Sequence, residues 1–518
     1  MALSTRQRRP LPSDVTSSSS EPYTKVSKPG RSNVREEEDK GLRWFLPLLA
    51  LGMLRYISAT SNIIHDCDEV FNYWEPLHYL LYKSGFQTWE YRTLYCLMLE
   101  RFDVDGLGFF FFLLAALSLL RSYLYINFHE LVGLPASWLN GDEKVRVFYA
   151  VRLFLGLISV VADATLVVAL SRKYGKRLAS YALAMLCLTS GCFFASTSFL
   201  PSSFSMYAMS LSSGLFLLGK PAMAVIVAAV GVILGWPFSI LAFLPVTFYS
   251  LARRFKQTFL AGAVTSIVLL GYIKVRKQKC LVPSIGFIMM PNSIWFLYPI
   301  YPLVCVAASA VIESFPDLFR DRYNTYDNSL MVMIAKFLRP VFLGLILCAS
   351  HARTFSLING YGAPIEVYKI LEHHDDAGIG SVLCVGSEWH RFPSSFFVPD
   401  YVSEIRWIDD GFRGLLPLPF NSTLGGTAAA PPYFNNKNKA ADEQYLRDLE
   451  TCTFLVELQL DRPYPSRGSD LSTWEPIAAY PYLDRELSPP MYRSFFIPYL
   501  WQEKNVFGLY KLYKRIRK

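Results

Sequence analysis

"RVFYAVRLFLGLISVVADATLVVALSRKYGKR" (residues 146–177) joins a long apolar run to a cluster of basic residues. The apolar part, 146–170, is long enough to cross about 30 Å of hydrocarbon as a helix. The basic part, 172–177, is typical of a loop on the cytosolic side of a membrane. An apolar run that ends in this way predicts a membrane-spanning fold.

The composition of the 518-residue chain supports this interpretation, because 52% of its residues are hydrophobic and only 18% are charged. Soluble domains average about 25% charged residues. The net charge of +9 comes largely from short basic clusters at the ends of apolar runs, such as 253–256. We therefore expect a membrane partner and no nucleic-acid partner.

Similar apolar runs recur and predict about nine crossings in a polytopic α-helical membrane protein. With a cytosolic N-terminus, this number leaves most basic loops cytosolic and the C-terminal third in the lumen. The basic cluster at 274–279 is an exception, because this topology places it on the luminal side. The apolar run at 107–120 is interpreted as re-entrant or lying on the membrane. The predicted spans are 44–64, 146–170, 178–199, 203–219, two short crossings within 222–251, 258–273, 294–312 and 330–350.

These spans divide the chain into three regions. Residues 1–43 are rich in Ser, Pro and charge and predict a disordered cytosolic tail. Residues 44–350 form the membrane domain, whose first luminal loop covers 65–145. Residues 351–518 predict a small mixed α/β luminal domain, because their apolar runs are short and bounded by Gly and polar residues.

The C-terminal region also carries two signs of a luminal position. The "NST" at Asn421 is a glycosylation sequon, which is used only in the lumen. Cys384 and Cys452 can form a disulfide in an oxidising compartment. Cys187, Cys192, Cys305 and Cys348 lie in apolar runs and are interpreted as packed core thiols.

The first luminal loop opens with an unusual concentration of negative charge, "HDCDEVFNYWEPLHYLLYKSGFQTWEY" (65–91). Its first eleven residues hold four carboxylates and no Lys or Arg. Asp68, Asn72 and Glu75 have helical spacing and are expected to share one face, with a helix break near Pro76. A stripe facing the bilayer boundary is predicted for Val70, Tyr73, Leu77 and Leu81.

Carboxylates beside aromatic rings are typical of carbohydrate sites, where rings cover sugar faces and carboxylates accept hydroxyl hydrogen bonds. A carboxylate can also act as general base toward an attacking hydroxyl. The alternative is an acidic, solvated loop without chemistry. The residues expected to contact a sugar acceptor are Tyr73, Trp74, Glu75 and Trp89.

A phosphate leaving group would need positive charge, and Arg55, Arg121 and Arg152 are the candidates. Arg55 lies inside the first predicted span, where a charge normally has a partner or a function. Arg152 and Asp163 are three helical turns apart and would share a face. A polar network inside the bundle is the alternative for these charges.

Beyond these patterns, the acidic loop closely resembles that of the dolichyl-phosphate-mannose-dependent α-1,2-mannosyltransferases of glycosyltransferase family 22. The resemblance covers most of residues 44–460 and implies the GT-C membrane fold. The other segments that carry it are "SFLPSSFSMY" (198–207), "GWPF" (235–238), "FLYPIYPL" (296–303), "VGSEWHRFPSSFFVPD" (385–400) and "FRGLLPLPF" (412–420).

The resemblance implies a catalytic base at Asp68, with Glu69 and Asp66 as further carboxylates of the site. It implies α-1,2 transfer of mannose from dolichyl-phosphate-mannose, with inversion, to lipid-linked oligosaccharides that receive the seventh and ninth mannoses. The reaction belongs to protein N-glycosylation and takes place in the lumen of the endoplasmic reticulum. No metal and no other cofactor are expected, because a lipid monophosphate leaving group does not demand a divalent cation.

Two segments depart from the family's pattern. Residues 92–120 look inserted, and residues 271–288 look shortened. The His-Lys-Glu-rich motif ending in Arg-Phe that family members carry before Phe296 is replaced by "MMPNSIW" (289–295). Three alternatives stay open: a sister mannosyltransferase of the glycolipid anchor or the α-1,6 branch, an inactive glycolipid-binding form, and a transporter.

Overall fold

The computed structural model describes most of the chain, and the described residues belong to one compact unit, Gly41–Lys518. The predicted tail therefore lies almost wholly outside the described residues, as do the apolar run at 107–120 and Asn421. The described residues are 42–88, 124–141, 143–277, 294–319, 330–420, 433–435, 438–461 and 467–516.

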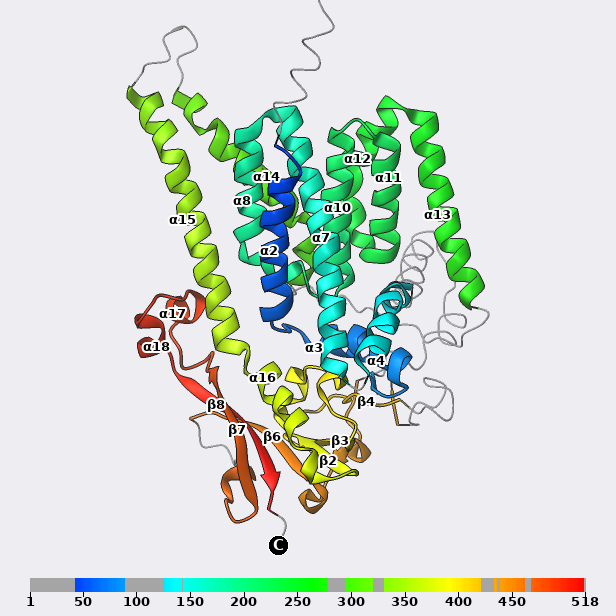
Figure 1. The fold of residues 1–518 in the computed structure, drawn as a ribbon, viewed down its shortest axis with the longest axis vertical. Helices are drawn as coiled ribbons and strands as arrows, with labels where there is room; N and C mark the ends of the chain where they lie inside the picture. The colour runs from blue at the N-terminus through cyan, green and yellow to red at the C-terminus, as the bar shows by residue number, and fades with distance from the viewer. Residues whose placement is uncertain are drawn as a thin grey trace, which may run out of the picture. The chain divides into compact units, whose positions relative to one another are not determined.

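Long helices run side by side in the upper part of this unit (Figure 1), and every predicted span overlaps at least one of them. The span predicted at 178–199 divides into two helices where Thr189 adopts an extended backbone. The helices are α2 (Phe45–Ser61), α7 (Lys144–Tyr174), α8 (Lys176–Leu188), α9 (Ser190–Ala195), α10 (Pro201–Leu217), α11 (Pro221–Val230), α12 (Ile240–Arg253), α13 (Phe255–Lys277), α14 (Tyr301–Ser314) and α15 (Leu330–Tyr361).

The ends of these helices follow from local sequence. Proline stands in the first turn of α10, α11 and α14, where its missing N–H costs no hydrogen bond. Gly175, with a φ of 101°, separates α7 from α8 in a conformation that disfavours other residues. Arg172 and Lys173 lie in the last turn of α7, where cations stabilise the helix end.

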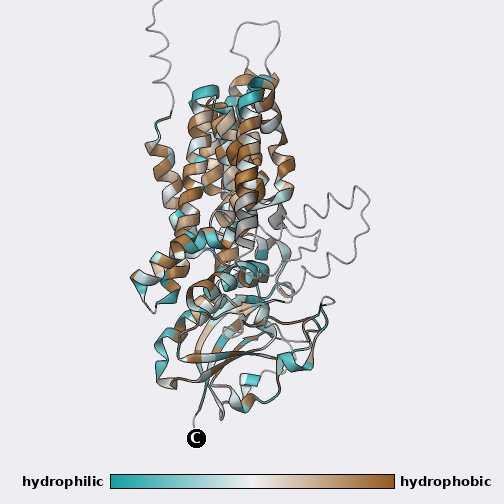
Figure 2. Ribbon diagram, turned by 90° about the vertical axis from the view of Figure 1, so that its right-hand side faces the viewer, coloured by the Kyte–Doolittle hydropathy of each residue, from teal (hydrophilic) through white to brown (hydrophobic). Residues whose placement is uncertain are grey.

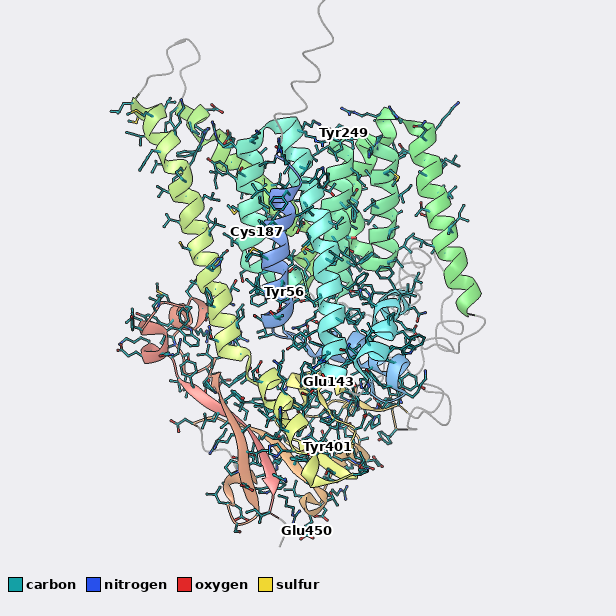
Figure 3. The ribbon with its side chains drawn as sticks, viewed as in Figure 1. Tyr56, Glu143, Cys187, Tyr249, Tyr401 and Glu450 are labelled. Atoms are coloured by element: carbon teal, nitrogen blue, oxygen red, sulfur yellow. A yellow bond between two sulfur atoms is a disulfide. The ribbon has the colours of Figure 1, made fainter. Side chains whose placement is uncertain are left out.

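The helical part has the character of a membrane protein. Among the described helices, α7, α15 and the helical stretch Leu297–Phe319 are long and apolar enough to cross a membrane, and four shorter helices are also apolar. Hydrophobic residues dominate these helices in Figure 2. Tyr56 on α2 and Tyr249 on α12, both labelled in Figure 3, are exposed, as expected for rings that face lipid. The chain is thus a mostly helical membrane protein, and the count of nine crossings stays a prediction.

The C-terminal third forms a six-stranded mixed sheet with the order β5-β3-β2-β6-β8-β7. The first four of these strands are parallel, and β8 pairs antiparallel with both β6 and β7. The prediction of a mixed α/β region with strands near 381–386 and 451–460 is confirmed. The strands are β2 (Ser381–Val385), β3 (Val402–Ile408), β5 (Tyr445–Leu446), β6 (Phe454–Gln459), β7 (Trp474–Leu483) and β8 (Phe507–Arg515).

Short helices α16 (Ala363–Lys369), α17 (Pro490–Ser494) and α18 (Leu500–Lys504) complete this region. The expected boundary after residue 350 falls inside a helix, because α15 continues without a break to Tyr361. The disulfide that the sequence left as a possibility is present: Cys384 on β2 is bonded to Cys452, just before β6. Of the predicted core thiols, Cys348 is instead exposed on α15.

The acidic segment is tied to this C-terminal region. The short strand β1 (Phe86–Gln87) pairs antiparallel with β4 (Leu418–Pro419). Phe71 stacks on Phe392 with ring centroids 6.1 Å apart, and both belong to one buried hydrophobic cluster. The first loop and the C-terminal third therefore share a core, and this core fixes where the carboxylates lie.

Candidate functional site

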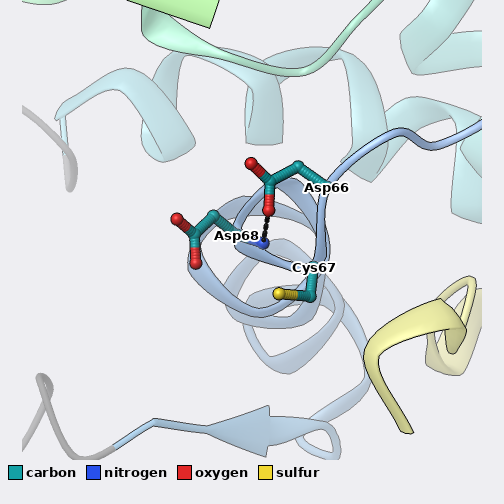
Figure 4. Close-up of side chains that lie close together, drawn as sticks. All are labelled: Asp66, Cys67 and Asp68. Carbon is teal, nitrogen blue, oxygen red and sulfur yellow. Dashed lines mark hydrogen bonds between the residues drawn. The ribbon is translucent and has the colours of Figure 1, made fainter. Parts of the chain in front are cut away.

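The acidic segment starts just after α2 with a pair of aspartates in a helical turn. Asp66 is the N-cap of α3 (Cys67–Glu69), and its Oδ1 accepts a hydrogen bond from the backbone N–H of Asp68 at 3.0 Å (Figure 4). Such a bond satisfies an N–H group that the first helical turn leaves unpaired. The cap therefore holds the two carboxylates next to each other.

Asp68 is the exposed carboxylate of this pair. The protein around it limits hydration of the carboxylate, and this desolvation together with the negative charge of Asp66 raises the pKa of Asp68 to about 6. A base whose pKa lies near the working pH is deprotonated at rest and accepts a proton more readily than an ordinary aspartate. The geometry thus suits Asp68 as a general base, with Asp66 as its positioning partner.

Glu69 has a different environment, because it is buried. Its Oε1 accepts hydrogen bonds from the indole N–H of Trp74 at 3.1 Å and from the backbone N–H of Phe199 at 2.9 Å. Burial raises the pKa of Glu69, while the positive charge of Arg152 acts in the opposite direction. These contacts favour a role in orienting the loop.

A π-helix changes which residues of the segment share a face. η1 (Val70–Trp74) follows α3, and each π-helical turn holds more residues than an α-helical one. Asp68 is exposed, whereas Asn72 and Glu75 are buried. The predicted common face of these three residues is therefore wrong. The expected break near Pro76 is wrong, because the backbone stays helical from α3 into α4 (Glu75–Tyr82) and only the helix type changes, with Pro76 in the first turn of α4.

Glu75 joins the acidic segment to the C-terminal region. Its Oε1 accepts hydrogen bonds from the Ser394 hydroxyl and the Ser395 N–H, both at 2.7 Å. Its Oε2 accepts from the Ser395 hydroxyl at 2.7 Å and the Phe86 N–H at 2.9 Å. Four donors satisfy the carboxylate away from water, so the geometry favours a structural clamp over the expected acceptor contact. The two serines lie in the quoted segment 385–400, but no local pattern connects them with Glu75.

The aromatic residues of the segment pack inside the protein. Tyr73 and Trp74 are buried, and the Trp74 ring lies 4.1 Å from that of Phe148. These rings therefore present no face to a sugar, and Trp89 lies outside the described residues. The predicted bilayer-facing stripe is wrong for the same reason, because its residues pack against other parts of the protein: Val70, Tyr73, Leu77 and Leu81.

Arg55 belongs to a polar network among the helices, and only its buried Nη1 has no hydrogen-bond partner among the described residues. Its Nη2 lies 3.1 Å from Asp163 Oδ2 and also donates to the Leu186 carbonyl at 2.9 Å. Its Nε donates to the Ser159 hydroxyl at 3.2 Å. Asp163 is thus the ion-pair partner of Arg55 and not of Arg152. This pair agrees with the alternative interpretation of these charges, a polar network inside the helix bundle.

Arg152 is the candidate arginine that lies beside the acidic segment. Its Nη1 donates to the Asn62 carbonyl at 2.5 Å, and its charge acts on Glu69. Within the described part of the chain, its buried Nε and Nη2 have no hydrogen-bond partner. Arg121 lies outside that part. Arg152 therefore retains donors for an anion.

The same turn contains potential metal ligands. The ligand atoms of Asp66, Cys67 and Asp68 lie within 4.8 Å of one another. Burial and the charge of Asp68 raise the pKa of the Cys67 thiol, so it is protonated near neutral pH and is a poor ligand in that form. Metal-independence stays a prediction.

Comparison with a family model described as the Alg9-like mannosyltransferase family gives a match over residues 46–98, 117–275 and 294–399. The matched ranges include the acidic segment, α7 and the serines that hold Glu75. The two breaks, 99–116 and 276–293, fall at the predicted insertion and at the shortened segment with the replaced motif.

Comparison with individual proteins also finds relatives named as α-1,2-mannosyltransferases. A protein named alpha-1,2-mannosyltransferase ALG9 from Arabidopsis thaliana is 62% identical over 589 residues, covering 99% of this chain and 99% of the relative. Relatives of that name from Mus musculus and Schizosaccharomyces pombe are 27% and 28% identical, covering 89% and 88% of this chain and 87% and 92% of their own lengths. No solved structure matches the chain.

Proposed function

Because the chain belongs to the Alg9-like mannosyltransferase family and is therefore a glycosyltransferase, we propose that it transfers mannose from dolichyl-phosphate-mannose to lipid-linked oligosaccharides in α-1,2 linkage. The name of the Arabidopsis thaliana relative supports the sugar and the linkage. The acceptors in this proposal are the oligosaccharides that receive the seventh and ninth mannoses for protein N-glycosylation.

The observation that carries the mechanism is the exposed Asp68 carboxylate beside its cap, Asp66. An acceptor hydroxyl is a weak nucleophile until a base takes its proton as it attacks. Asp68 is exposed to such a hydroxyl, and its raised pKa suits a proton acceptor. Glu69 and Asp66 hold the turn in place and are not themselves the base.

In the proposed step, the 2-hydroxyl oxygen of the acceptor forms a bond to C1 of the donor mannose. The bond between C1 and the phosphate oxygen breaks, the hydroxyl proton moves to Asp68, and dolichyl phosphate leaves. A single displacement of this kind inverts the β-linked donor to an α-linked product. It requires one base and no covalent enzyme intermediate.

Arg152 supplies the positive charge toward the leaving phosphate. Preorganised donors stabilise charge that develops in a transition state without reorganising at that moment. Its Nε and Nη2 are buried and have no hydrogen-bond partner among the described residues. A bound anion would accept hydrogen bonds from these two donors. Arg55 is assigned to the structural network with Asp163, and Arg121 stays a candidate.

We place the protein in the membrane of the endoplasmic reticulum, with about nine crossings, a cytosolic N-terminus and a luminal C-terminal region. The Cys384–Cys452 disulfide supports a luminal position, because disulfides persist in oxidising compartments. Asn421 should then carry a glycan that an endoglycosidase removes. Cleavage of this region by a protease added outside sealed microsomes would contradict the orientation.

The test of function is mannose transfer in microsomes that contain this protein as the sole enzyme of its kind. We would supply labelled dolichyl-phosphate-mannose and an acceptor that awaits its seventh mannose. Wild type should form an α-1,2-linked product, and Asp68→Asn should lower the rate by about 10²-fold to 10⁴-fold. The matched control is Asp442→Asn, which changes an exposed aspartate of the C-terminal region and should keep full activity.

Three results would contradict the proposal in different ways. An α-1,6-linked product would identify a sister enzyme. Undiminished transfer by Asp68→Asn would exclude this residue as the base. Absence of product, where the Arabidopsis thaliana relative is active in the same assay, would mean that the inserted and shortened segments inactivate the chain.

A further inference from the structure

A cavity of ≈710 Å³ lies beside the acidic segment, outside the site described so far. Its walls come from the linker 63–65, the end of α15, the 3₁₀ turn η9 (Ser387–Arg391) and the segment 482–494. Figure 1 shows the end of α15 beside α16 and close to α17 and the sheet. The most prominent polar side chains of the lining are Arg353, Arg391, Arg485, Arg493, Tyr361 and Tyr482.

Arg353, Arg485 and Arg493 form no ion pair with any residue that the structure describes. Arg353 Nη1 donates to the Ser494 carbonyl at 3.2 Å, and Arg493 donates to the Arg485 carbonyl. These bonds orient the guanidinium groups without neutralising them. The lining holds more arginines than carboxylates.

The carboxylates around the cavity offset part of this positive charge. Glu388 pairs with Arg391, which also lies 4.8 Å over the Tyr482 ring. Asp484 lines the cavity, and its Oδ1 accepts the backbone N–H groups of its own turn from Glu486 and Leu487. The remaining acidic lining residue, Glu486, is exposed.

All four arginines lie within electrostatic reach of one side chain. The guanidinium groups of all four arginines act electrostatically on the Tyr361 phenol at the end of α15, and Arg353 and Arg493 repel each other. Clustered guanidinium groups suit an anionic ligand, because each can donate charge-assisted hydrogen bonds to it. This clustering points to a ligand with phosphate-like charge.

The cavity also adjoins the candidate site. His65, which precedes Asp66, lines it and lies within the electrostatic reach of Arg353 on one side and Arg152 on the other. Burial and these two charges lower the pKa of His65 to about 3, so the ring is neutral near neutral pH and adds no charge of its own. A ligand in the cavity would thus lie next to the acidic turn.

We propose that this cavity binds the phosphate-bearing group of a polyprenyl-linked substrate, with Arg353, Arg485 and Arg493 as its contacts. Arginine suits this role because its planar donors match phosphate oxygens two at a time. Apolar lining residues such as Leu357 and Ile63 are available to the adjoining hydrocarbon chain. The inference rests on the proposed function, which supplies two ligands of this chemistry: the donor monophosphate and the acceptor diphosphate.

The test is lipid binding by the purified full chain in detergent, followed by thermal unfolding. The probes are dolichyl phosphate, dolichyl diphosphate and, as the uncharged control, dolichol. Arg485→Gln and Arg493→Gln should each weaken binding of the phosphorylated probe by about tenfold or more, the effect of removing one charge-assisted contact. Arg447→Gln, which changes an exposed arginine outside the cavity, should leave binding unchanged.

Each outcome decides the proposal. A preference for dolichyl phosphate or dolichyl diphosphate that the cavity variants weaken supports it and identifies the donor or the acceptor as the source. Equal binding of dolichol, or wild-type binding by both variants, overturns it. Arg485 is exposed, so its variant folds even where Arg493→Gln does not.

The measurement does not depend on catalysis, so it separates the two proposals. Arginine-dependent binding in a chain that transfers no mannose would contradict the proposed function alone. Mannose transfer with arginine-independent binding would contradict the cavity assignment alone.

Discussion

Replacing Asp66 by Asn should move the acid limb of the pH–rate profile to lower pH without abolishing transfer. Asn is as good an N-cap as Asp, so Asp66→Asn keeps the bond to the Asp68 N–H and removes only the charge. The Asp68 carboxylate then loses a negative neighbour, and its pKa falls. The proton acceptor is active when deprotonated, so a lower pKa extends activity to more acidic pH.

The expected shift follows from the distance between the two carboxylates. Their ligand oxygens lie within 4.8 Å of each other. A water-like dielectric gives the lower limit of their repulsion, which at that distance is about 0.9 kcal/mol. This energy corresponds to a pKa lower by about 0.6. The midpoint of the acid limb should therefore move from about 6 to about 5.4 or lower.

The assay is kcat/KM for mannose transfer between about pH 5 and pH 8, which reports the pKa of the free enzyme's base. At about pH 5.5 the variant should retain roughly twice the fraction of its maximal rate that wild type retains. Asp442→Asn controls for removal of a distant exposed charge. An unmoved midpoint, or a midpoint at higher pH, would refute the assignment of Asp68 as the titrating base.

Three further outcomes are expected. Glu75→Ala leaves four buried donors without an acceptor and should lower the free energy of unfolding by about 3 kcal/mol or more, measured by thermal unfolding in detergent. The exposed Glu143→Ala should change it by less than about 0.5 kcal/mol. The double variant Cys384→Ser, Cys452→Ser should cost about 2–5 kcal/mol, and reductant should destabilise wild type alone. Transfer should persist in excess chelator; a loss reversed by one divalent cation would assign a metal to the acidic turn.

Much of the helical part could be predicted because its signal is local. A membrane-length apolar run is a property of consecutive residues, and all predicted spans overlap observed helices. The proline of α4 and the strands β2 and β6 also follow from short windows. The role of Asp68 as base, which the family resemblance implies, stays a prediction; the capped turn that presents it involves only three consecutive residues.

The face of the acidic segment could not be predicted, because its helix type is set by packing. With the five-residue π-turn Val70–Trp74, Asn72 is buried, Glu75 contacts the C-terminal region and Asp68 stays exposed. The predicted common face assumed α-helical periodicity throughout, and the π-helix changes that periodicity. Here the shared hydrophobic core decides the register.

The sequence by itself determined that this is a helical membrane protein with a mixed C-terminal sheet and an acidic turn suited to a proton acceptor. Only the tertiary structure decided which charged side chains are paired inside the protein and which, like Arg152, keep hydrogen-bond donors without a partner among the described residues. Glu75 meets Ser394 across 319 residues, and Arg55 meets Asp163 across 108. Buried polar groups must find partners, and these partners come from distant parts of the chain, where no local pattern records them.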